Sequence, residues 1–486
     1  MTPTLSGLEP ALLWKHFGEL LQIPRCSGDE KAAGDYVVRV AERLTLSFNR
    51  DGVGNIVVQK PASSGHEAAQ PVILQGHLDM VCEKDSNVDH DFAKDPIQAR
   101  RDGDWLTATG TTLGADNGIG VAAALAVMEE NSLVHGPLEL LFTVDEERGL
   151  TGASQIGPDF LRGRTYLNLD SEEEGAFFIG CAGGGDSVIT VPLKRVEGTG
   201  GQRVRVVLTG LRGGHSGIDI DEGRGNAIKL LARMLWQAGK ERTYHLITLE
   251  GGSKRNAIPR EGSAELIVPR DEKDGFYKVL RSSFEAIKVE FRPVEKELDM
   301  RVEEVDGEIP HLCDASSQAT LINLLFGLPH GVLAMSQEIP DLVETSNNVA
   351  TVNCGDTWAK IGLSSRSSIG SALQATRDML RGLADMAGAE IEQPDGYPGW
   401  APDLNSPVLQ MMKETYKDLF GKDAEVKAIH AGLECGLIGE KFPGMDMVSF
   451  GPDLRHPHSP EERVRVASVE NFWKLLTAAL KRLAEA

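Results

Sequence analysis

The chain has 486 residues, of which 41% are hydrophobic and 25% charged, as is ordinary for a soluble globular protein. Its 50 basic and 72 acidic residues give a formal net charge of −22, and no basic block is present, which argues against nucleic acid as a partner. The longest apolar run, Val121–Met128, is shorter than the roughly 18 residues of a membrane helix, and the N-terminus lacks a signal-peptide pattern. We expect a cytoplasmic protein of two or three domains, without a membrane partner.

The first 180 residues alternate helix-like and strand-like patterns. The second expected helix opens with Ser27-x-x-Glu30, which has the form of a capping box. This alternation predicts an α/β domain with a mainly parallel sheet flanked by helices. The expected elements are, in chain order, helix 8–21, helix 27–44, strand 55–59, strand 71–74, helix 117–130, strand 137–144 and strand 165–169.

The pattern changes around Gly183–Gly185, where half-exposed antiparallel strands begin, and it returns to α/β alternation after the turn-rich stretch 394–402. We therefore expect one catalytic domain built from residues 1–186 and 399–486, with an α+β lid domain, residues 187–398, inserted into it. The glycines at 183–185 are interpreted as a turn or hinge between the two domains. The later elements are expected at strand 187–193, strand 203–208, helix 226–237, strand 264–269, strand 359–364, a helix from 407, strand 425–429, a helix near 433, strand 445–450 and a helix from 468.

The lid carries a weak internal echo. The segment Gly251–Pro259 precedes the strand 264–269, and the segment Glu344–Ala350 precedes the strand 359–364. This repeated order of segment and strand predicts two fused lobes of similar structure, with coincidence as the alternative explanation of so short an echo.

The six cysteines are scattered along the chain and include no Cys-x-x-Cys pair. That spacing is typical of reduced, mostly buried thiols in a cytosolic protein. Free thiols are therefore expected.

Side chains able to bind a metal follow the ends of several expected strands. His77 and Asp79, the run 145–147, Asp170 and His458 each come after an apolar strand, and Asp116 stands where the Ala-rich helix begins. Because ligands bind at the carboxyl ends of strands in open α/β sheets, these positions can converge in one crevice. Two histidines and three carboxylates suit Zn²⁺, or Mn²⁺ or Co²⁺, and one shared carboxylate would allow two ions about 3.5–4 Å apart.

Each of these residues also has a plain structural interpretation. His77 alone could be a satisfied core histidine, Asp116 an N-cap, and the run 145–147 a solvated acidic turn. Asp79 favours metal binding, because a carboxylate that accepts one imidazole proton fixes the tautomer that binds a metal. Five candidates in the same topological position favour a metal site over five separate coincidences.

With these residues in view, the chain resembles the aminoacylase/carnosinase family of co-catalytic zinc exopeptidases, and within it the aminoacyl-histidine (Xaa-His) dipeptidase group. The motifs that carry the resemblance are GHLDM at 76–80, LGADNG at 113–118, TVDEE at 143–147, LNLD at 167–170, RGGHSG at 212–217, HAGLECG at 430–436 and HPHSP at 456–460.

The resemblance implies two Zn²⁺ ions per chain, with Co²⁺ or Mn²⁺ as substitutes. Asp116 would bridge both ions, His77 and Asp170 would complete one site, and Glu147 and His458 would complete the other.

The resemblance also implies catalytic and substrate-binding roles. Glu146 would be the general base and Asp79 the partner of His77, while His215 in the lid would stabilise the oxyanion. Binding of the substrate's terminal carboxylate is implied for Asn256, Arg366 and Gly432.

The implied activity is hydrolysis of aminoacyl-histidine dipeptides by a hydroxide that bridges the metals. The sequence has no Gly-x-Ser-x-Gly elbow, so it gives no support to a covalent mechanism. The alternatives are N-acyl amino acids, tripeptides or other dipeptides as substrates, or a non-catalytic binding protein, which the presence of Glu146 and all five ligands disfavours. A homodimer is the other partner that the resemblance allows, although a doubled lid could supply within one chain what a second subunit would otherwise provide.

Overall fold

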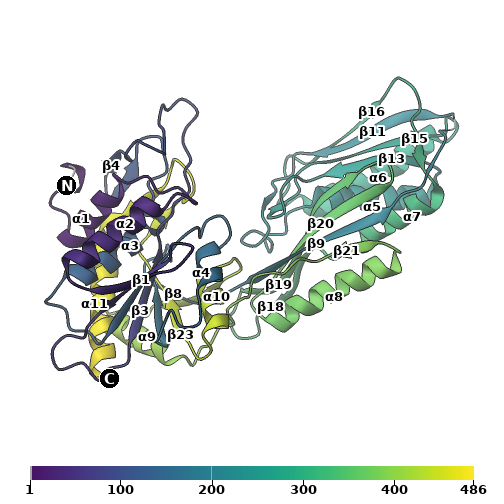
Figure 1. The fold of residues 1–486 in the computed structure, drawn as a ribbon. Helices are drawn as coiled ribbons and strands as arrows, with labels where there is room; N and C mark the ends of the chain where they lie inside the picture. Colours follow the sequence, from purple (N-terminus) through teal and green to yellow (C-terminus); the bar gives the residue numbers. More distant parts are fainter. Residues whose placement is uncertain (1–2, 199) are drawn as a thin grey trace. The chain divides into compact units, whose positions relative to one another are not determined.

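The structure, a computed structural model, describes residues 3–198 and 200–486, and the chain divides into two compact units (Figure 1). Unit 1 comprises residues 1–180, 402–428 and 433–486, and unit 2 comprises residues 181–401 and 429–432. The domain limits expected at 186/187 and 398/399 stay a prediction. The short return 429–432 means that Gly432 belongs to the same unit as the other lid candidates.

Unit 1 is built on an eight-stranded mixed sheet. The four central strands run parallel, and their side chains are largely buried on both faces, as expected for a sheet covered by helices. The strands lie in the order β1 (Ser47–Arg50), β2 (Ile56–Lys60), β6 (Leu138–Thr143), β3 (Val72–His77), β7 (Thr165–Asn168), β23 (Asp446–Ser449), β8 (Ala176–Cys181) and β22 (Glu425–Ile429). The expected α/β fold is therefore confirmed, with antiparallel pairing at β1–β2, β2–β6 and β23–β8.

Helix α3 (Ala115–Glu129) is buried along almost its whole length. Its alanines and glycines allow this close approach: a Cβ at Gly120 would lie 2.5 Å from the carbonyl oxygen of Leu169, just beyond β7. The other helices of the unit are η1 (Pro3–Leu5), α1 (Ala11–Leu20), α2 (Lys31–Arg43), α4 (Thr151–Gln155), α9 (Pro407–Phe420), α10 (Glu434–Lys441) and α11 (Val466–Glu485).

A four-stranded sheet brings the C-terminal loop close to the start of α3. Its strand order is β24 (Leu454–Arg455), β25 (Arg463–Arg465), β5 (Trp105–Ala108) and β4 (Ala99–Asp102). The loop between β24 and β25 carries His458, and β5 is followed within a few residues by the segment that leads to Asp116.

Two local expectations about residues 26–30 are wrong. Helix α2 begins at Lys31, and its N-cap residue Glu30 makes no side-chain cap hydrogen bond. The Ser27 hydroxyl instead donates to Asp79 Oδ2 at 2.8 Å, so the capping box does not form. Cys26 and Cys82 form a disulfide, which contradicts the expected free thiols at these positions. Their separation of 56 residues hid the contact, which arises because Cys26 pairs with Met80 in a β-bridge.

Unit 2 contains a nine-stranded sheet in which one β-α-β-β-α-β order occurs twice. The first half is β11 (Gln202–Thr209), α5 (Ala227–Glu241), β13 (His245–Gly251), β15 (Gly262–Val268), α6 (Lys273–Phe291) and β16 (Asp299–Glu304). The second half is β9 (Gly183–Pro192), α7 (Ala315–Gly327), β19 (Val343–Cys354), β20 (Trp358–Ser367), α8 (Gly370–Met386) and β21 (Glu390–Glu392).

The sheet order β16-β11-β15-β13-β19-β20-β9-β21 places corresponding strands symmetrically about the β13–β19 junction. The two halves meet there through the pairing of Gly251 with Val352. Short strands complete the unit: β10 (Arg195–Val196), β12 (Gly214–His215), β14 (Ala257–Ile258), β17 (Leu312–Cys313) and β18 (Gly331–Met335). Burial alternates along β11, so one face of the sheet packs into the core of the unit.

The interpretation of residues 183–185 as a hinge is wrong, because all three lie within β9 and pair with Ser365–Ser367 of β20. They are glycines because another segment crosses them closely. A Cβ at Gly183 would lie 2.4 Å from the Gly399 nitrogen, and one at Gly184 would lie 2.6 Å from the Tyr397 ring.

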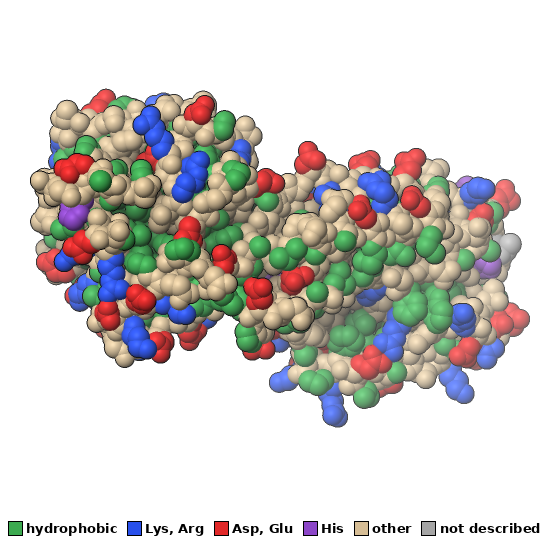
Figure 2. Space-filling model, turned by 90° about the horizontal axis from the view of Figure 1, so that it is seen from below, with side chains coloured by type: hydrophobic (Ala, Val, Ile, Leu, Met, Phe, Trp, Pro, Cys, Tyr) green, Lys and Arg blue, Asp and Glu red, His purple; other side chains and the backbone are tan. Residues whose placement is uncertain are grey.

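Acidic and basic side chains are interspersed over both units on the face that Figure 2 presents. Among the described residues, none of the helices combines the length and the apolar character that crossing a membrane requires.

Candidate metal centre and lid residues

The candidate metal ligands of unit 1 come from the carboxyl ends of neighbouring parallel strands. His77 is the last residue of β3, Glu147 follows β6, and Asp170 follows β7. Because β3 lies between β6 and β7 in the sheet, these three strand ends meet at one edge.

Asp116 lies between two histidines. Its Oδ1 is 3.1 Å from His77 Nε2, and its Oδ2 is 3.1 Å from His458 Nε2. Each carboxylate oxygen thus faces a different nitrogen donor, which is the arrangement required of a carboxylate shared by two ions.

The remaining two carboxylates complete two groups. Asp170 Oδ1 lies 3.3 Å from His77 Nε2, and Glu147 Oε2 lies 2.9 Å from His458 Nε2. The candidate ligand atoms of His77, Asp116 and Asp170 all lie within 4.8 Å of one another, as do those of Asp116, Glu147 and His458. The structure therefore brings together all five residues that the sequence singled out as ligands.

Asp79 is buried behind His77, with its Oδ1 3.3 Å from His77 Nδ1. Burial alone would raise the pKa of the Asp79 carboxyl, but its interaction with His77 holds that pKa well below its ordinary value. The same carboxylate accepts the backbone N–H groups of Glu146, at 3.0 Å, and Glu147, at 3.2 Å. Asp79 thus orients both the imidazole and the turn after β6.

That turn explains how two adjacent glutamates can serve one site. Asp145 has a φ of +53°, an uncommon conformation for a residue other than glycine, and it ends the alternation of the strand. Glu146 is half-buried beside the cluster, and burial raises the pKa of its carboxyl well above the ordinary value.

The protonation of the cluster reflects an excess of carboxylates. Burial would lower the pKa of His458, but hydrogen bonding to Asp116 and Glu147 raises it to about 11. Burial raises the pKa of Asp170 to about 6. Among the described residues, no hydrogen-bond partner reaches the buried Glu147 Oε1. Nitrogen and oxygen donors with uncompensated negative charge fit divalent cations.

A buried glutamate of unit 1 was missed by the sequence analysis. Glu434 on α10 accepts hydrogen bonds from Gln75 and, at 2.7 Å, from Thr143, and burial raises its pKa to about 7. In the sequence, Glu434 stands out only as a charged residue within a run of small and apolar residues. That pattern is equally typical of an exposed glutamate at the N-terminus of a helix.

In unit 2, backbone contacts fix the tautomer of His215. Its Nδ1 accepts the N–H groups of Gly217, at 3.2 Å, and Ile218, at 3.0 Å, so in the neutral ring the proton resides on Nε2. Burial, with the charge of Arg366, lowers the pKa of His215. The result is a neutral imidazole with one N–H group available as a donor.

His215, Arg366 and His430 surround Gly217, where a Cβ would lie 2.3 Å from the His430 carbonyl oxygen and 3.3 Å from Arg366 Cδ. His430 Nε2 lies 2.8 Å from the Ser346 hydroxyl, and burial lowers the pKa of His430 to about 4. His430 begins the motif HAGLECG, but the sequence alone indicates no role for it.

Arg366 is a buried cation, with only 8% of its surface exposed. Its Nη1 donates to the Tyr397 hydroxyl at 3.0 Å, whereas among the described residues its buried Nε has no hydrogen-bond partner and no carboxylate forms an ion pair with it. Gly432 lies beside the same ring, because a Cβ there would be 3.1 Å from Tyr397 Cε2. Arg366 and Gly432 are therefore brought together around Tyr397.

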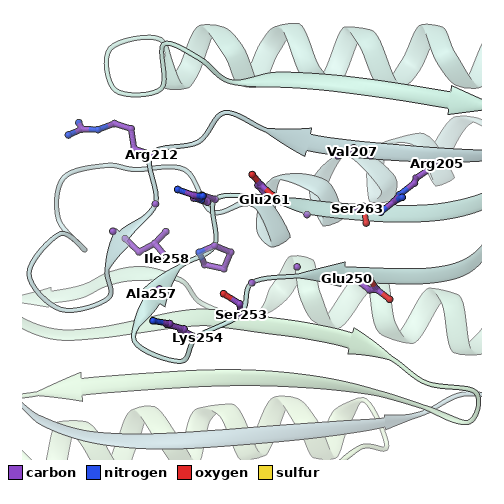
Figure 3. A pocket seen from close by; sticks show the side chains of 17 residues that line it. Arg205, Val207, Arg212, Glu250, Ser253, Lys254, Ala257, Ile258, Glu261 and Ser263 are labelled. Atoms are coloured by element: carbon purple, nitrogen blue, oxygen red, sulfur yellow. The ribbon is translucent and has the colours of Figure 1, made fainter. Parts of the chain in front are cut away.

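Asn256 is exposed, and its carbonyl accepts the Ser216 N–H at 2.9 Å, next to the pairing of His215 with Ala257 between β12 and β14. A hollow of about 690 Å³ borders this two-stranded sheet (Figure 3). Its charged lining residues are Arg205, Arg212, Lys254, Arg260, Glu250 and Glu261. None of the residues predicted to contact the substrate, namely His215, Asn256, Arg366 and Gly432, lines this hollow.

Comparison with known proteins gives matches over nearly the whole chain. The model of Peptidase family M20/M25/M40 matches residues 73–482. The cytosol non-specific dipeptidase of Escherichia coli is 44% identical over 480 residues, 99% of each chain. The crystal structure of aminoacylhistidine dipeptidase from Vibrio alginolyticus superposes with a TM-score of 0.91 at 41% identity, covering 98% of both chains. An aminopeptidase from Bacillus cereus shares the fold, with a TM-score of 0.56 at 16% identity over 98% of this chain and 99% of that one.

Proposed function

Because this chain belongs to Peptidase family M20/M25/M40, we propose that it is a metal-dependent dipeptidase that hydrolyses aminoacyl-histidine dipeptides. The observation that carries the proposal is the position of Asp116, whose two oxygens each face a different histidine. Such a carboxylate suits a pair of cations, and a pair of cations suits hydrolysis of an amide bond.

The proposed metal ligands are the five clustered side chains of unit 1. Asp116 would be shared by both ions, His77 and Asp170 would hold one, and Glu147 and His458 would hold the other. The buried Glu147 Oε1, which lacks a hydrogen-bond partner among the described residues, supports this assignment. The mixture of imidazole and carboxylate favours Zn²⁺, with Co²⁺ or Mn²⁺ as substitutes.

When bound, two such ions supply Lewis acidity, which lowers the pKa of a water molecule and polarises the substrate carbonyl. Glu146 takes the proton of the attacking water and delivers a proton to the leaving amine, acting first as base and then as acid. Asp79 keeps His77 in the tautomer that leaves Nε2 free for the metal. His215, whose backbone contacts place its proton on Nε2, donates to the carbonyl oxygen as negative charge develops.

Arg366 is proposed to bind the substrate's terminal carboxylate. A guanidinium that is 8% exposed and has no ion-pair partner among the described residues lacks a counter-charge, which a free C-terminus would supply. Gly432, beside Tyr397, and Asn256, whose carbonyl accepts the N–H of Ser216 next to His215, are proposed as further contacts to that end of the substrate.

The names of the two relatives differ in the breadth of substrate that they imply, a non-specific dipeptidase and an aminoacylhistidine dipeptidase. We propose the Xaa-His class as the first substrate to test and the cytoplasm as the location. Other dipeptides, tripeptides and N-acyl amino acids are the second candidates, since the same metal ligands would act on any of these amide bonds.

The test is release of histidine from β-alanyl-histidine by the purified, zinc-loaded protein, before and after treatment with a chelator. We expect release that stops on chelation and returns when Zn²⁺ is restored. A chain that holds two ions but leaves every dipeptide uncleaved would overturn the proposed substrate class while leaving the metal assignment intact. A chain that binds no divalent metal would overturn both.

A further inference from the structure

Glu462 is a buried carboxylate, 2% exposed, that the proposed mechanism does not use. Its Oε2 accepts the backbone N–H groups of Leu113, at 2.8 Å, and Gly114, at 2.9 Å. Its Oε1 accepts those of Ala115, at 2.7 Å, and Asp116, at 3.2 Å. One side chain thus satisfies four consecutive N–H groups at the start of α3, a place where such groups have no partner within the helix.

These hydrogen bonds join two segments that carry ligands. Asp116 is the last residue of the bonded run, and Glu462 lies four residues after His458 in the β24–β25 loop. The loop itself is tied to β5, because Thr107 Oγ1 donates to the Glu462 carbonyl at 2.8 Å. The position of His458 relative to Asp116 therefore depends on Glu462, whose side chain binds Asp116 through the backbone N–H and leaves the Asp116 carboxylate free.

Arg25 makes the equivalent connection on the other side. It is 2% exposed, and its Nη1 donates to the carbonyls of Leu78, at 3.1 Å, and Asp79, at 3.0 Å, directly after His77. Its Nη2 donates to the carbonyl of Gly114. Among the negative charges acting on the Arg25 guanidinium, that of Glu462 is the strongest.

Gly114 shows how tightly this arrangement is packed. Its φ of +71° favours glycine, and a Cβ there would lie 2.6 Å from Arg25 Nη2. The backbone thus passes directly against the guanidinium on one side, while Glu462 binds its N–H groups on the other.

We propose that Glu462, acting with Arg25, is a positioning residue that fixes the segments bearing His77, Asp116 and His458 before any metal binds. This inference rests on the proposed two-metal site. A pre-set site does not have to order its ligands when an ion arrives, so metal affinity depends on Glu462 although Glu462 touches no ion. Loss of a residue that supports metal ligands in this way typically weakens binding 10- to 100-fold.

The decisive variant is Glu462→Gln, which has nearly the same shape but replaces one accepting oxygen with an NH₂ group that faces backbone N–H donors. Zn²⁺ affinity, measured by competition with a chromophoric chelator, is expected to fall 10- to 100-fold. At saturating Zn²⁺, the KM for β-alanyl-histidine is expected to stay close to that of the original protein. Hydrogen exchange of the metal-free protein gives a second readout, in which amides 113–116 are protected in the original protein and exchange faster in the variant.

Two matched controls separate positioning from general loss of stability. Glu461→Gln removes the charge of the exposed neighbour. Glu139→Gln alters another buried carboxylate of unit 1 that accepts backbone N–H groups, those of Arg162 and Gly163. Glu139→Gln is expected to lower the melting temperature without changing Zn²⁺ affinity, and Glu461→Gln is expected to change neither.

Equal Zn²⁺ affinity in the Glu462→Gln variant and the original protein would overturn the inference, as would an equal loss of affinity in Glu139→Gln. If Glu462→Gln does not fold, Glu462→Asp provides the same test, since it keeps the charge but is too short to hold all four N–H groups, and unchanged affinity there would also overturn the inference. Failure of the original protein to bind Zn²⁺ would instead refute the two-metal site, so the two failures are distinguishable.

Discussion

The histidines of the two units have pKa values shifted in opposite directions, although burial lowers the pKa of both. In unit 1, carboxylates raise the pKa of His458 to about 11, whereas in unit 2 burial, with the charge of Arg366, lowers the pKa of His430 to about 4. The difference between the two pKa values arises from the charges nearby, which are carboxylates in unit 1 and a guanidinium in unit 2. The comparison teaches that unit 1 offers a site for cations, while unit 2 offers a neutral donor and a cation suited to an anion.

The largest effect on activity is expected from replacing Glu146 in unit 1, because Glu146 is not one of the five proposed metal ligands. Glu146→Gln should retain both ions, because the five ligands remain, but lose about 10²- to 10⁴-fold in kcat, as loss of a general base typically does. Steady-state kinetics together with metal analysis of the same sample would measure both. Activity near that of the original protein would refute the assignment of the base.

The proposed anion site of unit 2 is tested by Arg366→Ala. Loss of a charged hydrogen-bond partner costs about 1.5–3 kcal/mol, so KM for a dipeptide is expected to rise roughly 10- to 150-fold with metal content unchanged. A dipeptide amide, which lacks the terminal carboxylate, should bind the variant and the original protein alike.

Arg366→Lys serves as the control for charge alone, because lysine cannot offer a two-pronged contact to a carboxylate. It is expected to recover only part of the affinity. A KM unaffected by either substitution would remove Arg366 from the site and erase the contrast between the units.

The smallest expected effect is on stability in acid. Because the pKa of His430 is about 4 in the folded protein and about 6.5 in an unfolded chain, the unfolded state binds more protons between these values. The contribution of His430 to stability should therefore fall as pH drops from about 6.5 to about 4, by about 2 kcal/mol at pH 5. Urea unfolding of the original protein and of His430→Asn at pH 7 and pH 5 would show this, because the variant should lose that much less stability on acidification, whereas substitution of the exposed His311 should leave the pH dependence unchanged.

Much of the metal cluster could be predicted from sequence because it depends on strand ends. His77 and Asp170 follow apolar runs that form parallel strands of one sheet, and that topology fixes where their side chains meet. Asp116 was predictable only through its motif, since the backbone at this residue departs from helical geometry and its role as an N-cap was an equally good local interpretation.

The remaining features depend on contacts between distant segments, which local patterns do not encode. Glu462 meets residues more than 340 positions away, and the Cys26–Cys82 disulfide closes a separation of 56. Ser27 stands where the sequence pattern predicts a helix-capping residue, but its hydroxyl donates to Asp79 instead. A hydrogen bond to a buried carboxylate is stronger than one that the hydroxyl would accept from a backbone N–H at a helix end. The sequence around the glycines at 183–185 does not distinguish them from hinge glycines. What explains them is the segment 397–399, which lies too close to Gly183 and Gly184 to leave room for a Cβ.

The central claim is that Asp116 joins two cation sites in unit 1. Its most direct test is the metal content of the original protein and of Asp116→Ala after equilibration with Zn²⁺ and removal of excess, with Asp102→Ala as an exposed control. The account predicts two ions per chain in the original protein and the control, and loss of tight binding at both sites in Asp116→Ala. Two tightly bound ions in Asp116→Ala, or a single ion in the original protein at saturation, would contradict it.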